Sequence, residues 1–194
     1  IDLNKKSIIS VDTETSALDP QVAELIGISL SYAKNISFYI PVGHKNIKSL
    51  NKDFVIKKLK PILEDPSIKK VGQNIKYDFI ILKKYGIELN SVEDTMLLSY
   101  TLDAGNNRHN MDTLSELHLN HKTISYKDLV GSGKKQLKFS EVDIDKATEY
   151  AAEDADVTLR LYEILSERVS DEKLSQIYEA CLLYTSPSPR DQEA

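Results

Sequence analysis

The chain has 194 residues, of which 41% are hydrophobic and 28% are charged, and its formal net charge is −5 at pH 7. The length suits one domain or two small ones, and the acidic balance excludes a protein that coats nucleic acid by charge alone. It does not exclude one that meets phosphates through bound metal. No apolar run approaches the roughly 20 residues that span a bilayer, and a single cysteine cannot form an intramolecular disulfide. We therefore expect no membrane association and a cytoplasmic location.

Strand-like segments come first along the chain. Residues 7–12, 22–33 and 36–41 are rich in β-branched and aromatic residues and follow one another at hairpin spacing, which predicts three successive strands. A shorter strand is predicted at residues 69–72, after an intervening helix.

Helical spacing of apolar residues dominates the rest of the chain. It predicts helices at residues 53–64, 75–85, 94–102, 111–119 and 140–169. Pro61 is expected to kink or end the first of these, Gly86 to stop the second, and Ser140 to cap the last. Strands followed by helices indicate an α/β domain, with a mixed central β-sheet flanked by helices.

The composition changes abruptly near the end of the chain. From Cys181 onward the sequence CLLYTSPSPRD alternates serine and proline, and it resembles the translation of a transposon-end adaptor used to prepare sequencing libraries. We expect residues 181–194 to be such an artefact and disordered; a Pro-rich linker is the alternative. Residues 1–180 are then expected to be one domain, truncated at both ends.

Two carboxylates stand at the end of the first predicted strand. Asp12 and Glu14 are two residues apart, so on a strand their side chains project from the same face. Carboxylates this close raise each other's pKa unless a cation lies between them. For so short a motif, a solvated turn is the alternative interpretation.

A third carboxylate, Asp78, lies within a predicted helix. It stands three residues after Ile75 and three before Ile81, so it falls on or beside the apolar stripe. An uncompensated carboxylate there would be costly, which indicates either a functional role or a satisfied boundary position.

The fourth carboxylate occupies a core-facing position of the last helix. An apolar stripe with spacings of 4, 3, 4, 3 and 4 runs through Ala147, Ala151, Asp154, Thr158, Leu161 and Leu165. An acid in that stripe must be neutral, paired with a buried Arg or Lys, or bound to metal. Tyr150 lies one turn earlier on the same face, so its hydroxyl can share a site with Asp154.

A divalent metal centre explains all of these acidic positions together. The candidate ligands are oxygen atoms only, with no histidine or cysteine nearby in the sequence. Such a set favours the hard ions Mg²⁺ or Mn²⁺ over zinc.

Three motifs in this chain resemble the exonuclease motifs of the 3′→5′ proofreading domain of family A DNA polymerases, the DNA polymerase I type. They are DTET at residues 12–15, GQNIKYD at 72–78 and YAAEDAD at 150–156, and the resemblance covers residues 7–170. It implies a ribonuclease-H-like fold. Because Tyr150 precedes Asp154 by four residues and position 149 is Glu and not His, it also implies the tyrosine branch of the DEDD exonucleases.

The resemblance implies two-metal hydrolysis of a phosphodiester bond, with two Mg²⁺ or Mn²⁺ ions about 3.5–4 Å apart. Asp12, Glu14 and Asp154 would hold the ion that lowers the pKa of the attacking water. Asp12 would bridge to the second ion, which Asp78 would hold largely through water and which stabilises the departing 3′ oxygen. Tyr150 would orient the nucleophile.

The resemblance also implies contacts with a DNA strand. Leu18 matches an apolar wedge between terminal bases, and Tyr126, which is often Phe in the family, matches an aromatic residue that stacks on the 3′ nucleotide. Other positions near the strand are Gln73, Asn74, Tyr77 and Arg108. Without the resemblance, Leu18 and Tyr77 could equally be core residues and Arg108 a solvated loop charge.

The expected activity is therefore a metal-dependent 3′→5′ exonuclease that acts on single-stranded or frayed DNA 3′ ends and proofreads during DNA replication and repair. A polymerase domain is expected downstream in cis, and the protein is expected to be a monomer. The alternatives are a stand-alone RNA 3′ exonuclease similar to ribonuclease D and an inactive module that only binds DNA ends. All four acids and the tyrosine are present, which favours an active enzyme.

Overall fold

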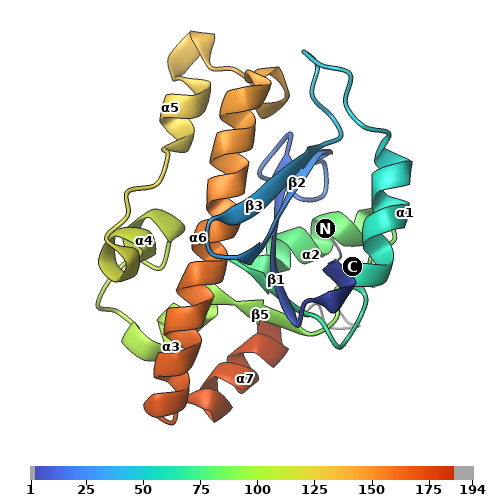
Figure 1. Cartoon of the computed structure of the whole chain (residues 1–194). Coiled ribbons are helices and arrows are strands. Elements are labelled where there is room, and N and C mark those ends of the chain that lie inside the picture. The colour runs from blue at the N-terminus through green and yellow to red at the C-terminus, as the bar shows by residue number, and fades with distance from the viewer. Residues whose placement is uncertain (1–2, 186–194) are drawn as a thin grey trace.

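A computed structural model describes residues 3–185 of the chain (Figure 1). In this part of the chain a single mixed sheet has the strand order β3-β2-β1-β4-β5. Its strands are β1 (Ile8–Thr15), β2 (Leu25–Ala33), β3 (Ile36–Pro41), β4 (Lys69–Gly72) and β5 (Val92–Asp94). β2 pairs antiparallel with both β1 and β3, whereas β4 pairs parallel with both β1 and β5. The predicted α/β class with a mixed central sheet is confirmed.

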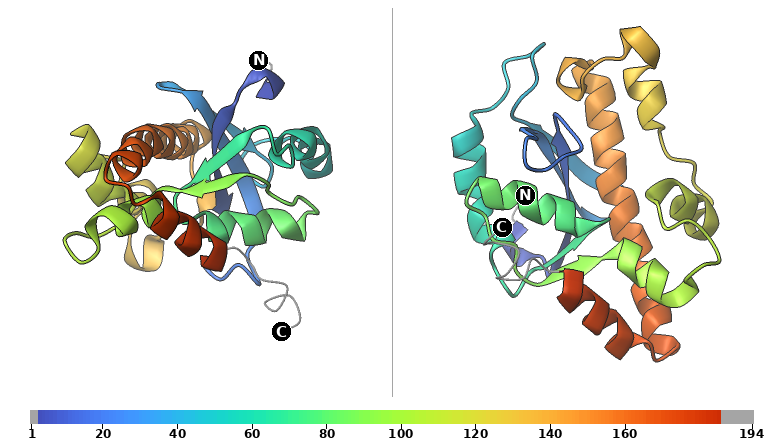
Figure 2. Two further views of the ribbon diagram at one scale, coloured as in Figure 1. Left: turned by 90° about the horizontal axis from the view of Figure 1, so that it is seen from below. Right: turned by 180° about the vertical axis from the view of Figure 1, so that it is seen from behind.

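Helices cover both faces of the sheet (Figure 2). They are α1 (Lys52–Leu63), α2 (Ile75–Lys84), α3 (Thr95–Asp103), α4 (Met111–Leu119), α5 (Tyr126–Val130), α6 (Ile144–Asp171) and α7 (Ser175–Thr185), with 3₁₀ turns η1 (Leu3–Lys5), η2 (Gly133–Lys135) and η3 (Phe139–Glu141). The long α6 crosses one face, with α3 and α4 packed against it, while α1 and α2 cover the other face.

Two larger hydrophobic cores follow from this arrangement, and a smaller third one surrounds Phe139. On the α1–α2 side, Ile9 and Val11 of β1 pack with Leu59 of α1 and Ile81 of α2. On the α6 side, a second core joins β4, α3, α4, α6 and α7. Alternation along β1 sends residues 9 and 11 to the first core, and it leaves residues 10, 12 and 14 facing α6.

The structure adds elements that the sequence did not reveal. The edge strand β5 has three residues and no hydrophobic alternation, and α5 has five residues, so neither carries enough periodicity to be recognised. Pro61 does not end α1, because it lies in the last turn at an exposed position, where water can satisfy the carbonyl that lacks a donor.

The cap predicted for α6 was wrong. Ser140 lies buried in η3, and α6 begins at Ile144 with Asp143 as its N-cap. The Asp143 carboxylate accepts from the backbone N–H groups of Asp145 and Lys146 at 3.2 and 3.4 Å. A carboxylate satisfies these donors and also complements the helix dipole, so it is well suited to this position.

The expectation of disorder from Cys181 onward was wrong for the first five residues, which continue α7 to Thr185. The segment 181–185 is mostly apolar and contains no glycine or proline, so it can extend the helix. The Ser/Pro-rich part at 186–194 lies outside the described residues. Among the helices of residues 3–185, none combines the length and apolarity that a membrane crossing requires.

Candidate active site

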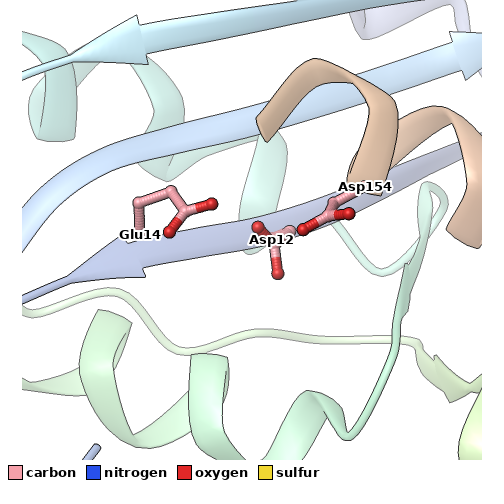
Figure 3. Close-up of side chains that lie close together, drawn as sticks. All are labelled: Asp12, Glu14 and Asp154. Carbon is pink, nitrogen blue, oxygen red and sulfur yellow. The ribbon is translucent and has the colours of Figure 1, made fainter. Parts of the chain in front are cut away.

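The sheet and α6 bring three carboxylates together. The side chains of Asp12 and Glu14 leave β1 on the face that α6 covers, and Asp154 reaches them from α6 (Figure 3). One oxygen from each carboxylate lies within 4.8 Å of the other two. The Ser10 hydroxyl donates to the Ala155 carbonyl at 2.6 Å, an approach that the small alanine allows, and this bond fixes β1 against α6 beside the site.

Asp78 approaches from the other face of the sheet. It lies in the first turn of α2 and is only 3% exposed. One of its oxygens accepts from the backbone N–H and the hydroxyl of Thr13, at 2.9 and 2.6 Å. Asp78 is therefore not one of the three converging carboxylates, although its charge acts on Asp12 and Glu14. Thr13, which the sequence did not single out, holds it in place.

The metal-free fold disfavours the charged form of all four carboxylates. Burial raises the pKa of Asp12 to about 6. The pKa values of Glu14, Asp78 and Asp154 are raised well above their usual range, first by burial and then by repulsion from Asp12.

No positive charge compensates this repulsion among the described residues. The ion pairs between them involve none of the four acids. A buried Arg or Lys partner for Asp154 is therefore not found in this part of the chain. Converging carboxylates with no basic partner are a donor set that fits a hard divalent cation.

An aromatic group closes one side of the site. The Tyr150 hydroxyl forms a hydrogen bond with Asp154, and burial together with that negative charge raises the pKa of Tyr150. Buried Phe139 packs against the Tyr150 ring with centroids 6.2 Å apart. Tyr39 packs on Phe139 in turn, and a Cβ at Gly27 would collide with the Tyr39 ring. Phe139 carries no recognisable motif, so the sequence offered no signal for its role.

The carboxylates border a cavity of about 780 Å³, lined by Asp12, Glu14, Asp78 and Tyr150 among others. Leu18 lies at its edge and is 95% exposed, so it is not a core residue. The Tyr77 hydroxyl bonds to the Thr15 hydroxyl and donates to the Ala17 carbonyl, both at 2.6 Å, and so holds the loop that carries Leu18.

The predicted DNA contact Tyr126 lies beside the predicted catalytic residue Tyr150. Tyr126 begins α5 and is 45% exposed, and the edge of its ring faces Tyr150 with centroids 6.0 Å apart. Both rings line the cavity, so a flat base has an aromatic surface available there.

The remaining predicted DNA contacts differ in whether their side chains line the cavity and whether they already form hydrogen bonds within the protein. Asn74 lines the cavity with an exposed side chain that caps nothing. Gln73 also lines it, but its amide donates to the His109 carbonyl at 2.8 Å and accepts from the Thr95 hydroxyl, so it holds the segment before α4. Arg108 is exposed in that segment and does not line the cavity.

Solved structures define the class of protein. The fold is similar to that of Brucella melitensis NrnC, with a TM-score of 0.74 at 22% identity over 95% of this chain and 84% of that one. It is also similar to the catalytic core of RRP6 from Trypanosoma brucei, with a TM-score of 0.72 at 15% identity over 94% of this chain and 47% of that one. The mixed sheet with flanking helices is thus a ribonuclease-H-like fold, as predicted.

The sequence comparisons then identify the family. A family model described as 3′-5′ exonuclease matches residues 2–170. DNA polymerase I of Rhizobium leguminosarum is 46% identical over 92% of this chain and 20% of its own length, and DNA polymerase I of Pseudomonas aeruginosa is 43% identical over 86% and 19%. The chain belongs to the 3′→5′ exonuclease domain family of family A DNA polymerases. It spans about a fifth of the length of these curated relatives.

Proposed function

We propose that this domain removes nucleotides one at a time from single-stranded or frayed DNA 3′ ends, by hydrolysing the terminal phosphodiester with two bound Mg²⁺ or Mn²⁺ ions. The observation that carries the proposal is the convergence of three carboxylates without a basic partner, beside a cavity large enough for nucleotides. Family membership supports the reaction type, because this family consists of metal-dependent exonucleases.

The carboxylates divide into two groups for metal binding. Asp12, Glu14 and Asp154 would hold one ion with their converging oxygens. Asp12 would share the second ion with Asp78, whose oxygen Oδ1 is already occupied by Thr13. Bound divalent ions lower the pKa of a water nucleophile and neutralise the charge that develops on the leaving oxygen.

The aromatic residues position the reactants. Because the pKa of Tyr150 is raised, its hydroxyl stays protonated at neutral pH and can donate to the attacking water to orient it. Tyr126 would stack on the terminal base, and the exposed Leu18 would separate it from the next one. Stacking accepts any base, as an editing enzyme requires.

The whole protein's role is a further part of the proposal. The relatives are DNA polymerases I, which supports DNA as the substrate, a polymerase domain downstream in cis and proofreading as the purpose. The acids and aromatic residues of the proposed site all belong to one copy of the chain, so the proposed reaction needs no second copy and the protein is proposed to act as a monomer. The single cysteine is compatible with the cytoplasm.

A labelled-oligonucleotide assay tests the activity. Single-stranded DNA labelled at its 5′ end is incubated with the protein in Mg²⁺, in Mn²⁺ or in EDTA, beside an RNA of the same sequence. We expect products that shorten from the 3′ end with either metal, none in EDTA, and slower cleavage of RNA. If neither metal supports nucleotide release, the proposal fails; faster cleavage of the RNA would reassign the substrate.

Tyr150→Phe tests the assigned role of the hydroxyl. The ring packing on Phe139 and Tyr126 is retained, so we expect hydrolysis to slow by about 10–100-fold while metal binding, followed by calorimetry with Mn²⁺, changes little. An unchanged turnover would show that the hydroxyl does not act on the nucleophile.

A further inference from the structure

The charges around the cavity are unevenly distributed. Among the cavity-lining residues of the described chain, Lys138 carries the one basic side chain, against the acidic Asp12, Glu14 and Asp78. A nucleic-acid strand brings one negative charge per phosphate into this acidic surrounding. Metal can neutralise that charge at the carboxylates, but the rest of the wall needs its own source of positive charge.

Neighbouring contacts fix the backbone of Lys138, while its ammonium group acts on Glu141 only through its charge and forms no ion pair with it. Its backbone N–H donates to Glu141 at 3.2 Å, while the other oxygen of Glu141 pairs with Lys45 at 2.8 Å. Phe139, the next residue, is buried against Tyr150. In the ion pairs between described residues the Lys138 side chain takes no part, although it is exposed at the cavity wall.

The segment that carries Lys138 is strongly basic in an acidic protein. Residues 127–138 include four lysines and one aspartate, whereas the whole chain has a net charge of −5. Lys127 and Lys135 of this segment are also exposed. The segment that contributes Lys138 to the cavity wall therefore carries an excess of positive charge, which attracts a polyanion.

We propose that Lys138 binds a backbone phosphate of the nucleic-acid strand as it enters the cavity. This inference rests on the proposed exonuclease function and adds a binding residue for the strand that no motif of the family pointed to. Lysine contacts phosphate as a point charge without reading the base, so the contact would serve every sequence equally.

Charge-removing and charge-retaining variants test the proposal in the intact chain. Lys138→Gln removes the charge, Lys138→Arg keeps it, and Lys57→Gln is the matched control, because Lys57 is an exposed lysine on α1. Binding of a fluorescently labelled single-stranded oligonucleotide is measured by anisotropy in EDTA at several salt concentrations. KM and kcat are measured separately with Mg²⁺, and melting curves show that each variant is folded.

Lys138→Gln is expected to raise Kd and KM by about three- to tenfold and to lower the slope of log Kd against log salt concentration by about 0.7, with little effect on kcat. Lys138→Arg and Lys57→Gln should both keep the Kd, the KM and the salt slope of the wild type. A neutral methylphosphonate at the contacted linkage should weaken binding of the wild-type chain but not of Lys138→Gln.

An unchanged Kd and salt slope for Lys138→Gln, or an equal effect of Lys57→Gln, would overturn the proposal. The two proposals fail separately. An inactive wild-type chain would reject the exonuclease function, while the binding measurements in EDTA would still decide whether Lys138 holds a phosphate.

Discussion

The four acids of the site occupy positions that disfavour their charged form. Burial raises the pKa of each of them, and repulsion from neighbouring acids raises it further for Glu14, Asp78 and Asp154. Hydrogen bonds such as that from Ser29 to Asp12 at 3.2 Å compensate only in part. In the metal-free protein these residues therefore reduce the free energy of unfolding. Their placement is accounted for by the proposed metal site and not by a contribution to the stability of the fold.

Asp154→Ala should abolish cleavage without destabilising the metal-free fold. The substitution removes a carboxyl group whose charged form is disfavoured by burial and by repulsion from Asp12, and it leaves the neighbouring apolar stripe intact. We expect the Tm in EDTA at pH 7.5 to stay the same or rise, while nucleotide release is lost. Glu149→Ala removes an exposed acid from the same helix and should keep normal activity. A Tm loss of many degrees for Asp154→Ala would instead make the residue structural.

Stability in EDTA should fall as the pH rises from about 4 to about 6. The pKa of Asp12 is 3.8 as a free group and about 6 in the fold, so between these values the unfolded chain has lost a proton that the folded chain keeps. Ionisation of Asp12 therefore favours the unfolded state. Its contribution lowers the free energy of unfolding by roughly 2–3 kcal/mol once the pH is above 6. Urea denaturation at several pH values measures it.

The comparison for this pH effect is Asp12→Asn, which cannot ionise at that position. Its free energy of unfolding should fall less over the same pH range. The variant should therefore become more stable relative to the wild type as the pH rises. Parallel pH profiles for the two proteins would contradict the assigned cause.

At the level of elements, one buried side chain joins the two helices next to the site. Asp94 is 3% exposed and accepts from the backbone N–H groups of Asn74 and Ile75 at the start of α2, at 3.1 and 3.0 Å. It also accepts from Met96 and Leu97 at the start of α3, at 2.9 and 3.4 Å. Since α2 carries Asp78, this double cap fixes the position of a proposed metal ligand.

Asp94→Ala should lower the free energy of unfolding by about 1–4 kcal/mol, because it leaves donors at two helix starts without a partner. Urea denaturation measures the loss. Asn51→Ala removes the cap of α1 only and should cost about 1 kcal/mol without affecting hydrolysis. Asp94→Ala should slow hydrolysis as well. Equal effects of the two variants would show that the double cap has no special role.

At the level of the whole molecule, the site exists only because distant segments meet. The end of β1, the start of α2 and the middle of α6 converge at the carboxyl end of the central strand, where the parallel pairing of β1 with β4 brings α2 beside β1. A cation bound there would link both faces of the sheet through the acids, so metal binding should be coupled to global stability.

Mn²⁺ should therefore raise the Tm of the chain. At a Mn²⁺ concentration 100-fold above its Kd, the free energy of unfolding should increase by about 2.7 kcal/mol. For a chain of this size, that corresponds to a Tm increase of about 5–10 °C. Melting curves with and without Mn²⁺ measure the change. Asp154→Ala should show a much smaller increase, and an equal increase in that variant would place the metal elsewhere.

The sequence by itself determined the class of fold, the family and the candidate acids. Strand and helix periodicities are local patterns, and the carboxylates were detectable because Asp78 and Asp154 interrupt apolar stripes where charge is costly. The same logic failed for β5 and α5, which are too short to show a period, and for Ser140, where a neighbouring carboxylate was the better cap.

The tertiary structure alone decided which groups meet. Thr13 holds Asp78, the His109 carbonyl accepts from the Gln73 amide, and Lys138 lines the same cavity as Asp12. Each of these depends on packing between segments far apart in the chain. Local patterns carry no information about such contacts. They are settled by how the sheet pairs and by which helix faces fit against it, and these are properties of the whole fold.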